Sequence, residues 1–179
     1  MEYEKLVSAR RSHRTFAGGE LEPWQVESVL RAALMSPTSR NNRSWRFVVV
    51  EDKTDLEKLS DVKEHGSAFV GGAAMAVVVT GRPSLNDCWV EDGSIAAYSM
   101  LLQAEDLGLA SCWVQVRGRR LSDGTASSDV VRGILSIPDE EEVLCIIAIG
   151  RKAQELPPHG DEELKWENVH IGHMDDSGL

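Results

Sequence analysis

Four apolar runs constrain the fold of this chain more than any other feature. They occupy residues 46–50, 74–80, 110–116 and 143–149. Each run is short and predicts a strand. Residues 46–50 are nearly continuous and β-branched, and this strand and the one over residues 74–80 are expected to be buried. Segments with helical patterns separate the runs, so the sequence predicts an α/β or α+β sheet with helices on both faces.

The helical patterns differ in how much of their surface is apolar. The helix expected from Pro23 to about Ser36 carries one apolar stripe. Its members are Val26, Val29, Leu30, Ala33 and Leu34. Residues 81–92 are expected to form a loop, and a helix over residues 93–107 is apolar nearly all round, which indicates burial on more than one side. Shorter helices are expected over residues 3–10, 54–62 and 128–135.

Chain length predicts one domain with an extended arm. The 179 residues fit one domain, which we expect over residues 1–150. Residues 151–179 are expected to form an arm of the same domain that has spaced apolar anchors but no room for its own core. We expect such an arm to pack on another surface. Its anchors are Leu164, Trp166, Val169 and Ile171.

Composition argues against several functional classes. The formal net charge of −10 disfavours general binding to nucleic acid or anionic membranes. No apolar run approaches the roughly 20 residues that span a bilayer, and the start of the chain does not resemble a secretory signal, so we expect a cytoplasmic location. Cys88, Cys112 and Cys145 lack CxxC or metal-ligand spacing, so reduced core thiols and no metal site are expected.

One segment of this acidic chain is basic. Residues 10–46 contain seven arginines and three glutamates, a local charge of +4 against the net charge of −10. Most of the arginines fall in residues 10–16, just after a short helix, and in residues 36–47, a Pro/Ser/Asn-rich loop before a strand. Each cluster alone could be an ordinary helix end or turn. Together, with hydroxyl and amide groups interleaved, they favour an anionic ligand such as a phosphate.

Four motifs, in order along the chain, resemble the FMN-dependent nitroreductase family. Residues 10–16, RRSHRTF, resemble its R-R-S-x-R-x-F signature. Residues 36–47, SPTSRNNRSWRF, resemble [A/S]-P-S-x-x-N-x-Q-P-W-x-F, with Arg-Ser in place of Gln-Pro. Residues 92–116 resemble the family's central helix followed by G-L-G-S-C-W-I, and residues 137–150 resemble its closing I-P … L-x-x-G.

The resemblance implies an α+β, three-layer α/β/α-like fold with a central, mostly antiparallel sheet flanked by helices. It also implies a homodimer with exchanged C-terminal arms and FMN at the interface, each site being lined by both chains. Tightly bound FMN would take electrons from NAD(P)H, a transient reductant, and pass them to a nitroaromatic, quinone or similar flat acceptor in a ping-pong reaction. No catalytic side chain is implied, because N5 of the flavin carries the chemistry.

The resemblance also implies which residues bind FMN. The amino-terminal motif is expected at the phosphate or ring edge, and the loop of the second motif is expected to close over the tail of the same cofactor. These residues are Arg10, Arg11, Ser12, Arg14, Pro37, Thr38, Ser39 and Asn41. Backbone of Trp113, Val114 and Gln115 is expected at the ring, with the Gln115 amide near N5. Arg151 or Lys165 is expected to supply a C-terminal base for the phosphate.

Several alternatives stay open at this stage. The chain could bind or sense flavin without efficient turnover, perform dehalogenation or flavin fragmentation on the same scaffold, or be an interaction protein that has lost its ligand. Residues 117–120 are a solvated turn in the simplest interpretation and a contact for the 2′-phosphate of NADPH in another. The acceptor, the choice between NADH and NADPH, and two- or four-electron reduction are equally open.

Overall fold

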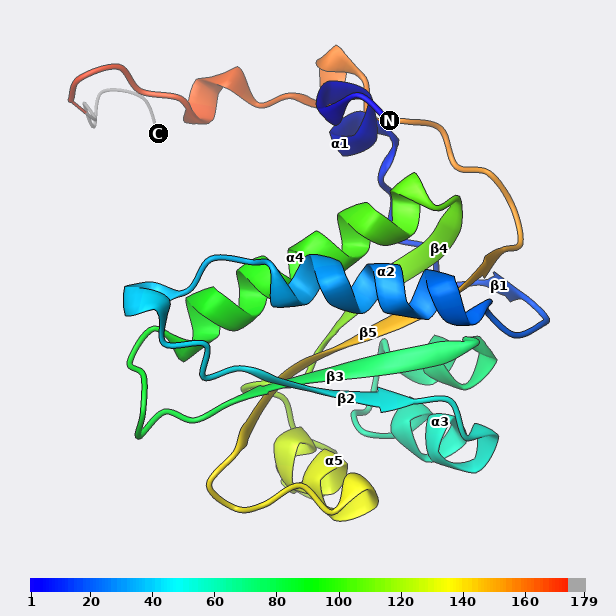
Figure 1. Ribbon diagram of the computed structural model, residues 1–179, viewed down its shortest axis with the longest axis vertical. Helices are drawn as coiled ribbons and strands as arrows, with labels where there is room; N and C mark the ends of the chain where they lie inside the picture. Colours follow the sequence, from blue (N-terminus) through cyan, green and yellow to red (C-terminus); the bar gives the residue numbers. More distant parts are fainter. Residues whose placement is uncertain (174–179) are drawn as a thin grey trace.

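The computed structural model describes residues 1–173 and contains one open five-stranded sheet (Figure 1). Its strands are β1 (Phe16–Ala17), β2 (Arg46–Val50), β3 (Met75–Gly81), β4 (Leu109–Gln115) and β5 (Glu142–Lys152). β5 pairs with β1, β3 and β4, and β2 pairs with β3. Every pairing is antiparallel, which confirms the expected sheet and the α+β class.

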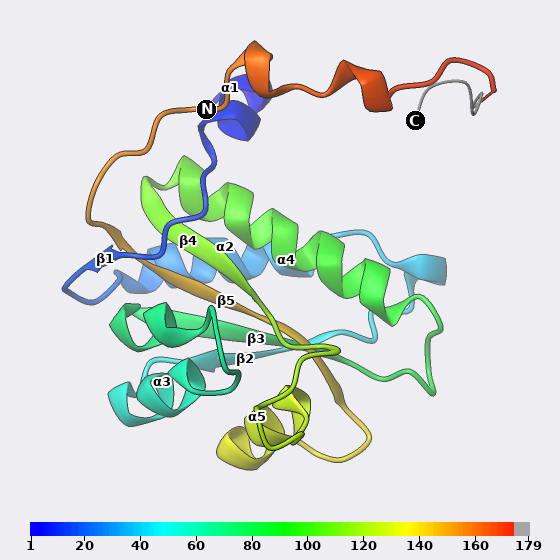
Figure 2. The same ribbon diagram turned by 180° about the vertical axis from the view of Figure 1, so that it is seen from behind.

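Helices cover both faces of this sheet (Figures 1 and 2). α2 (Pro23–Leu34) and α4 (Trp89–Asp106) lie on one face, α3 (Lys53–Ser60) and α5 (Ser127–Leu135) lie on the other, and α1 (Tyr3–Ala9) contacts α4. Val79 and Ile147 belong to the core under α2 and α4. Their neighbours Val78 and Ile146 belong to the core on the opposite face. Both faces are buried, which explains why the strands are continuous apolar runs.

α4 begins at Trp89, so the expectation of a loop as far as residue 92 was wrong. Its first turn contains Glu91 and Asp92, and acidic side chains there stabilise a helix N-terminus. Gly93 is a packing point and not the start of the helix. A Cβ added to Gly93 would lie 2.7 Å from Leu144 Cδ2, so the glycine permits close approach of α4 to β5.

After Lys152 the chain leaves the sheet and forms an arm with two 3-10 turns, Asp161–Glu163 and Trp166–Asn168. A hydrogen bond from His159 N to Ser8 O at 2.9 Å ties the start of the arm to α1. Beyond this point the arm extends away from the body (Figure 1). Its apolar anchors, Leu164, Trp166, Val169 and Ile171, are 50%, 69%, 60% and 97% exposed.

Within residues 1–173, no helix has the length and apolar character needed to cross a membrane. The same part of the chain holds no group of three or more His, Cys, Asp or Glu side chains placed to bind a metal ion.

Candidate functional site

The first basic motif runs along the outer edge of β4. Ser12 forms an isolated parallel bridge with Ser111, and the His13 N–H donates to the Ser111 carbonyl at 3.0 Å. β4 lies at the edge of the sheet, because in the described chain β5 is the only strand that pairs with it. The bridge therefore fixes the backbone between Arg10 and Arg14 against the sheet.

Three positive side chains, Arg10, Arg14 and Lys63, lie near Cys112 at this edge, and a fourth, Arg119, lies near Lys63. Burial raises the pKa of the Cys112 thiol, and the charges of Arg14, Arg10 and Lys63 are close enough to oppose that rise. Burial lowers the pKa of Lys63, and the neighbouring Arg119 lowers it further. We call Arg10, Arg14, Lys63 and Arg119 the basic cluster.

The basic cluster has no acidic counterpart in the part of the chain that the structure describes. None of its four side chains forms a salt bridge there. Like charges held together without a counter-charge disfavour one another; the pKa of Lys63 is lowered first by burial and then by the charge of Arg119. A phosphate dianion would relieve this repulsion through charge-assisted hydrogen bonds. The cluster therefore fits the phosphate of a cofactor such as FMN.

Sequence reasoning missed two members of the cluster. Lys63 follows α3 in an irregular segment, and Arg119 lies in the turn after β4. Only folding brings these two residues together, so the local sequence carried no signal for Lys63. The arginine-rich turn at residues 117–120 was a partial signal for Arg119. In that turn Arg117 stacks over a tryptophan ring, and Arg120 donates to a backbone carbonyl of its own turn.

The loop of the second motif lies at the N-terminal end of α4. The Ser39 N–H donates to Asp92 Oδ1 at 2.9 Å in the first turn of that helix. Arg43 N donates to Thr38 Oγ1 at 3.1 Å, and Arg43 Nε donates to Asn41 Oδ1 at 2.9 Å. All four expected loop residues, Pro37, Thr38, Ser39 and Asn41, are at least partly exposed.

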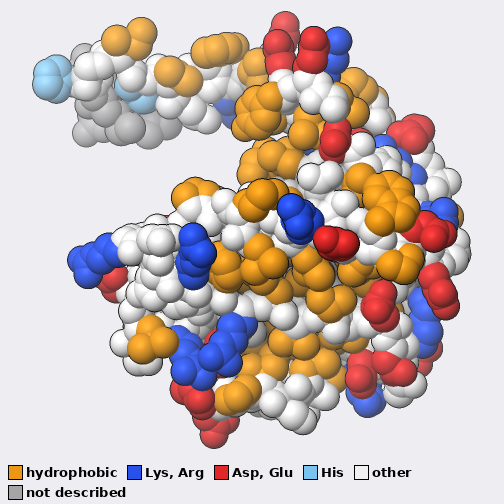
Figure 3. Space-filling model, in the orientation of Figure 1, with side chains coloured by type: hydrophobic (Ala, Val, Ile, Leu, Met, Phe, Trp, Pro, Cys, Tyr) orange, Lys and Arg blue, Asp and Glu red, His pale blue; other side chains and the backbone are white. Residues whose placement is uncertain are grey.

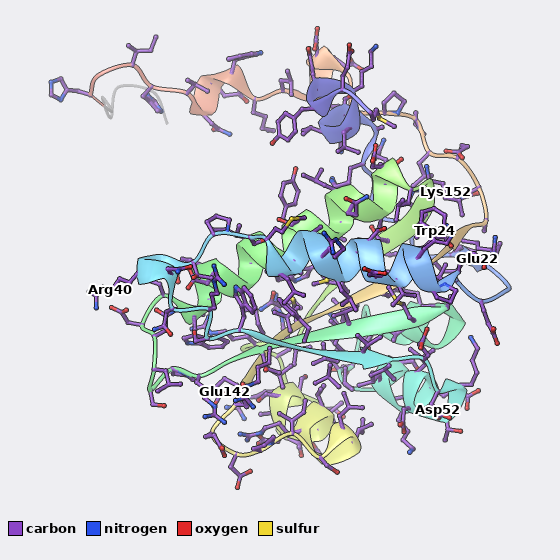
Figure 4. The ribbon with its side chains drawn as sticks, in the orientation of Figure 1. Glu22, Trp24, Arg40, Asp52, Glu142 and Lys152 are labelled. Carbon is purple, nitrogen blue, oxygen red and sulfur yellow. The ribbon has the colours of Figure 1, made fainter. Side chains whose placement is uncertain are left out.

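The two motifs lie at opposite ends of α4. His13 of the first motif lies near Glu105 in the last turn of α4, whereas Ser39 is bonded to Asp92 in its first turn. Thirteen residues of helix separate Glu105 from Asp92, about 20 Å at 1.5 Å per residue. In Figure 4, Arg40 of the loop and Lys152, which lies near His13 of the first motif, are on opposite sides of the molecule. Within one chain the two motifs therefore lie apart, and the expectation of a cofactor site lined by two chains is the one under which both could contact the same cofactor.

The three residues expected at the flavin ring occupy the end of β4. Trp113 packs against the core under α2 and α4, while Val114 is buried in the opposite core. Trp113 Nε1 donates to Gln115 Oε1 at 3.0 Å, and Gln115 Nε2 donates to the Arg117 carbonyl at 2.8 Å. Because the Gln115 side chain is engaged locally, the backbone is the polar group that this segment can offer a ligand.

The other expected basic residues are engaged elsewhere. The Arg11 guanidinium donates to the Pro157 carbonyl at the start of the arm. Arg151 donates to the Glu20 carbonyl through Nε at 3.2 Å and Nη2 at 2.9 Å. Lys165 lies on the exposed part of the arm. In this chain, neither Arg151 nor Lys165 joins the basic cluster.

The buried His13 is expected to make the folded protein sensitive to mild acid. Burial lowers the His13 pKa from 6.5 and Lys152 lowers it further, while Glu105 and Glu155 oppose the shift without cancelling it. Between the folded-state pKa and 6.5 the unfolded chain binds the proton and the folded chain does not. The free energy of unfolding therefore falls as the pH drops below 6.5, until the folded-state pKa is passed.

His13→Gln should flatten this part of the stability profile. Urea denaturation of the ligand-free protein between about pH 7.5 and about pH 5 measures the slope. His65→Gln is the control, because the His65 side chain is 91% exposed. Equal slopes for the wild type and His13→Gln would contradict this account of the pKa.

Comparison with known proteins places the chain in a family. The sequence model described as "Nitroreductase family" matches residues 7–66 and 61–151. The chain belongs to the nitroreductase family. This confirms the family expected from the four motifs, together with its oxidoreductase class.

Individual nitroreductase relatives match over most of their length. A protein from Archaeoglobus fulgidus, provisionally named an NADH dehydrogenase/NAD(P)H nitroreductase, is 31% identical over 171 residues, covering 93% of this chain and 95% of its own. A Methanothermobacter thermautotrophicus protein with the same name is 32% identical over 157 residues, covering 86% and 79%. The structure of an FMN-dependent nitroreductase from Clostridium difficile superposes with a TM-score of 0.93 at 37% identity, covering 96% and 99%.

The structural match to the C. difficile protein extends further along the chain than the match to the family model. The family model stops matching at residue 151, but the structural superposition covers 96% of the chain. The uncovered 4% is far shorter than residues 152–179, so most of the arm has a structural counterpart in that protein.

Proposed function

We propose that this nitroreductase-family oxidoreductase binds FMN between two subunits and uses NAD(P)H as its reductant. The observation that carries the proposal is the basic cluster, four positive side chains on an acidic chain with no acidic partner in residues 1–173. The FMN dependence of the C. difficile protein and the NAD(P)H in the names of the archaeal relatives support the choice of cofactor and reductant.

Arg10 and Arg14 are the residues we propose to hold the FMN phosphate, with Lys63 and Arg119 adding positive charge. A hydrogen bond to a charged group contributes about 1.5–3 kcal/mol, so the two arginines contribute about 3–6 kcal/mol. The Ser12 hydroxyl, fixed on the same edge, suits a further phosphate oxygen. A micromolar dissociation constant requires about −8 kcal/mol, and burial of the apolar ring supplies the remainder.

FMN, when bound, supplies the hydride chemistry through its own ring. The protein's contribution is then binding, orientation and electrostatics, which explains why the motifs contain no catalytic triad or carboxylate pair. The backbone edge of Trp113, Val114 and Gln115 would orient the ring, and Thr38, Ser39 and Asn41 would bind polar atoms of the cofactor's tail.

A second copy of the chain explains how the two motifs can reach one cofactor. α4 exposes Ile95 and Tyr98, 43% and 41% exposed, and α2 ends beside Leu34 and Met35, 54% and 72% exposed. Figure 3 shows hydrophobic side chains on the body beneath the arm. A two-fold dimer that pairs α4 helices antiparallel places the C-terminal end of one beside the N-terminal end of the other. The loop at residues 37–41 of one subunit would then face the basic cluster of its partner.

The arm would provide the second part of this interface. Hydrophobic side chains also line the arm in Figure 3, and all four of its anchors are exposed. We propose that residues 151–179 embrace the partner subunit and bury these anchors there. Interfaces of this kind are large and obligate.

We propose a ping-pong reaction in which reductant and acceptor use the same open face of the cofactor in turn. The sequence has no GxGxxG motif after a strand, which would indicate a resident dinucleotide. A visiting nicotinamide and a flat acceptor such as a nitroaromatic or quinone would then compete for one site.

Anaerobic stopped-flow absorbance tests this function directly. Mixing the FMN-loaded protein with NADH or NADPH should bleach the flavin band, and later addition of a nitroaromatic or quinone should restore it. Flavin that binds but never bleaches would contradict turnover and favour a flavin-binding or sensing role. Double-reciprocal plots that intersect, where ping-pong kinetics require parallel lines, would contradict the shared site.

A further inference from the structure

We infer that Asp92 and Asn86 are positioning residues for the FMN site, because together they hold the loop at residues 37–43 in the shape that reaches the partner's cofactor. This inference rests on the proposed function, in which the loop completes the site across the subunit interface. Neither side chain is expected to touch FMN.

Asp92 and Asn86 form a buried hydrogen-bonded pair, 4% and 6% exposed. Asp92 Oδ2 accepts from Asn86 Nδ2 at 2.7 Å, and Asp92 Oδ1 accepts from the Ser39 N–H at 2.9 Å. Asn86 Nδ2 also donates to Ser44 Oγ at 3.2 Å, and Asn86 Oδ1 accepts from the Cys88 N–H at 3.0 Å. The pair thus holds the loop near both of its ends, at Ser39 and Ser44, against the start of α4.

The loop between these contacts has a backbone that L-amino acids rarely adopt. Arg40, Asn41 and Arg43 have positive φ angles of 53°, 55° and 52°. Such conformations persist where surrounding contacts over-determine them, and they cluster at ligand-binding sites. The Asn42 side chain adds an exposed hydrogen bond to the Leu85 carbonyl at 2.8 Å. The buried pair is therefore the firm attachment of a strained loop to the body.

Stability alone is a weak reason for a carboxylate at this position. Buried charges cost desolvation free energy, and apolar replacements of buried charged groups are often neutral or stabilising. The first turn of α4 reduces that cost for Asp92, because the helix dipole favours negative charge there. The carboxylate supplies two acceptors at a fixed separation, one for the loop N–H and one for Asn86. This arrangement determines the geometry of the loop.

The two side chains can be exchanged without a change of net charge. Asp92→Asn alone sets an amide donor against the Asn86 amide donor. Asn86→Asp alone sets two carboxylates against each other at the 2.7 Å contact. In the double variant D92N/N86D each donor again meets an acceptor, and the side chain at position 92 still accepts from the Ser39 N–H.

The experiment measures FMN dissociation constants of these three variants by flavin fluorescence, at a temperature where each ligand-free protein is fully folded. Each single variant should bind FMN at least about tenfold more weakly than the wild type, which corresponds to one lost hydrogen bond. The double variant should return to within about threefold of the wild-type value. Asn86→Ser removes the contact to Asp92 without adding a charge, and it should also weaken FMN binding. This variant replaces a single variant that does not fold.

Val50→Ala is the matched control for general destabilisation. Val50 is 5% exposed at the end of β2 that is remote from the loop. It should lower the Tm while leaving the FMN affinity unchanged, whereas Asp92→Asn should lower the affinity. A merely structural role predicts equal FMN affinities for the two variants.

The outcomes separate the inference from the proposed function. Wild-type FMN affinity in a folded Asp92→Asn, Asn86→Asp or Asn86→Ser variant overturns the inference and leaves the proposed function intact. A double variant that regains its Tm but not its FMN affinity also overturns the inference. A wild-type protein that does not bind FMN overturns the proposed function, and the inference with it.

Discussion

Replacing Arg10 and Arg14 together with glutamine is expected to weaken FMN binding by about two to four orders of magnitude. Each arginine offers charge-assisted hydrogen bonds of about 1.5–3 kcal/mol to a phosphate, and about 1.4 kcal/mol corresponds to a tenfold change in affinity. Glutamine keeps hydrogen-bonding capacity but removes the charge. Quenching of flavin fluorescence during titration of the ligand-free protein measures the effect.

Arg31→Gln is the matched control for this experiment. Arg31 lies on the exposed surface of α2, where its guanidinium is 3.8 Å from Glu27, and it is distant from the first motif in the sequence. Its replacement removes a positive charge but should leave FMN affinity unchanged. Wild-type affinity in the Arg10→Gln, Arg14→Gln double variant would show that the basic cluster does not bind the phosphate.

Glu141→Ala is expected to lower the free energy of unfolding by about 3–5 kcal/mol, the usual cost of breaking a buried ion pair by removing one partner. The Glu141 side chain is 2% exposed and accepts from Arg82 Nε at 2.7 Å and Thr80 Oγ1 at 2.9 Å. Arg46 Nε lies 3.2 Å from the same carboxylate. Removing the Glu141 carboxylate leaves the half-buried Arg82 without its main partner. Urea denaturation of the ligand-free protein measures the loss.

The neighbouring Glu140 provides the control for Glu141. Its carboxylate lies 3.1 Å from Arg82 Nη2, but its side chain is 56% exposed. Solvent screens such a pair, so Glu140→Ala should cost less than about 1 kcal/mol. Equal losses for the two variants would contradict the assignment of Glu141 as the buried centre of this network.

The strands were predictable because their signal is local. Residues 143–149 are a β-branched run with both faces buried, and residues 46–50 are a β-branched run that is partly buried. Such runs form strands in almost any sheet context. Strand order and direction were carried only by the family resemblance, because pairing depends on contacts between distant parts of the chain. The two-residue strand β1 was missed for the same reason, since its only support is pairing with the end of β5.

The start of α4 was misplaced because a glycine can mark either the end of a helix or a position of close packing inside one. Gly93 looked like the boundary of a helix, since glycine is unfavourable in helix interiors. In the structure its missing side chain makes room for Leu144 of β5, which no local pattern reports. The acidic pair Glu91 and Asp92 was the better signal of the helix N-terminus.

The candidate site was predictable only in part. The arginines and hydroxyls of the first motif are adjacent in sequence, so their clustering follows from the chain itself. Lys63 and Arg119 join them only through the fold. The separation of the two motifs depends on the length of α4 and on where each motif is anchored along it, which no motif encodes.

A mixed dimer tests most directly whether one FMN is held by two chains. One chain carries Arg10→Gln and Arg14→Gln, and the other carries Thr38→Ala, Ser39→Ala and Asn41→Ala, so neither homodimer has an intact site. The heterodimer, purified through two different tags, regains one site composed of wild-type arginines from one chain and a wild-type loop from the other. We expect one FMN per heterodimer, bound with wild-type affinity. A heterodimer that binds FMN no better than the two variant homodimers would contradict the shared site.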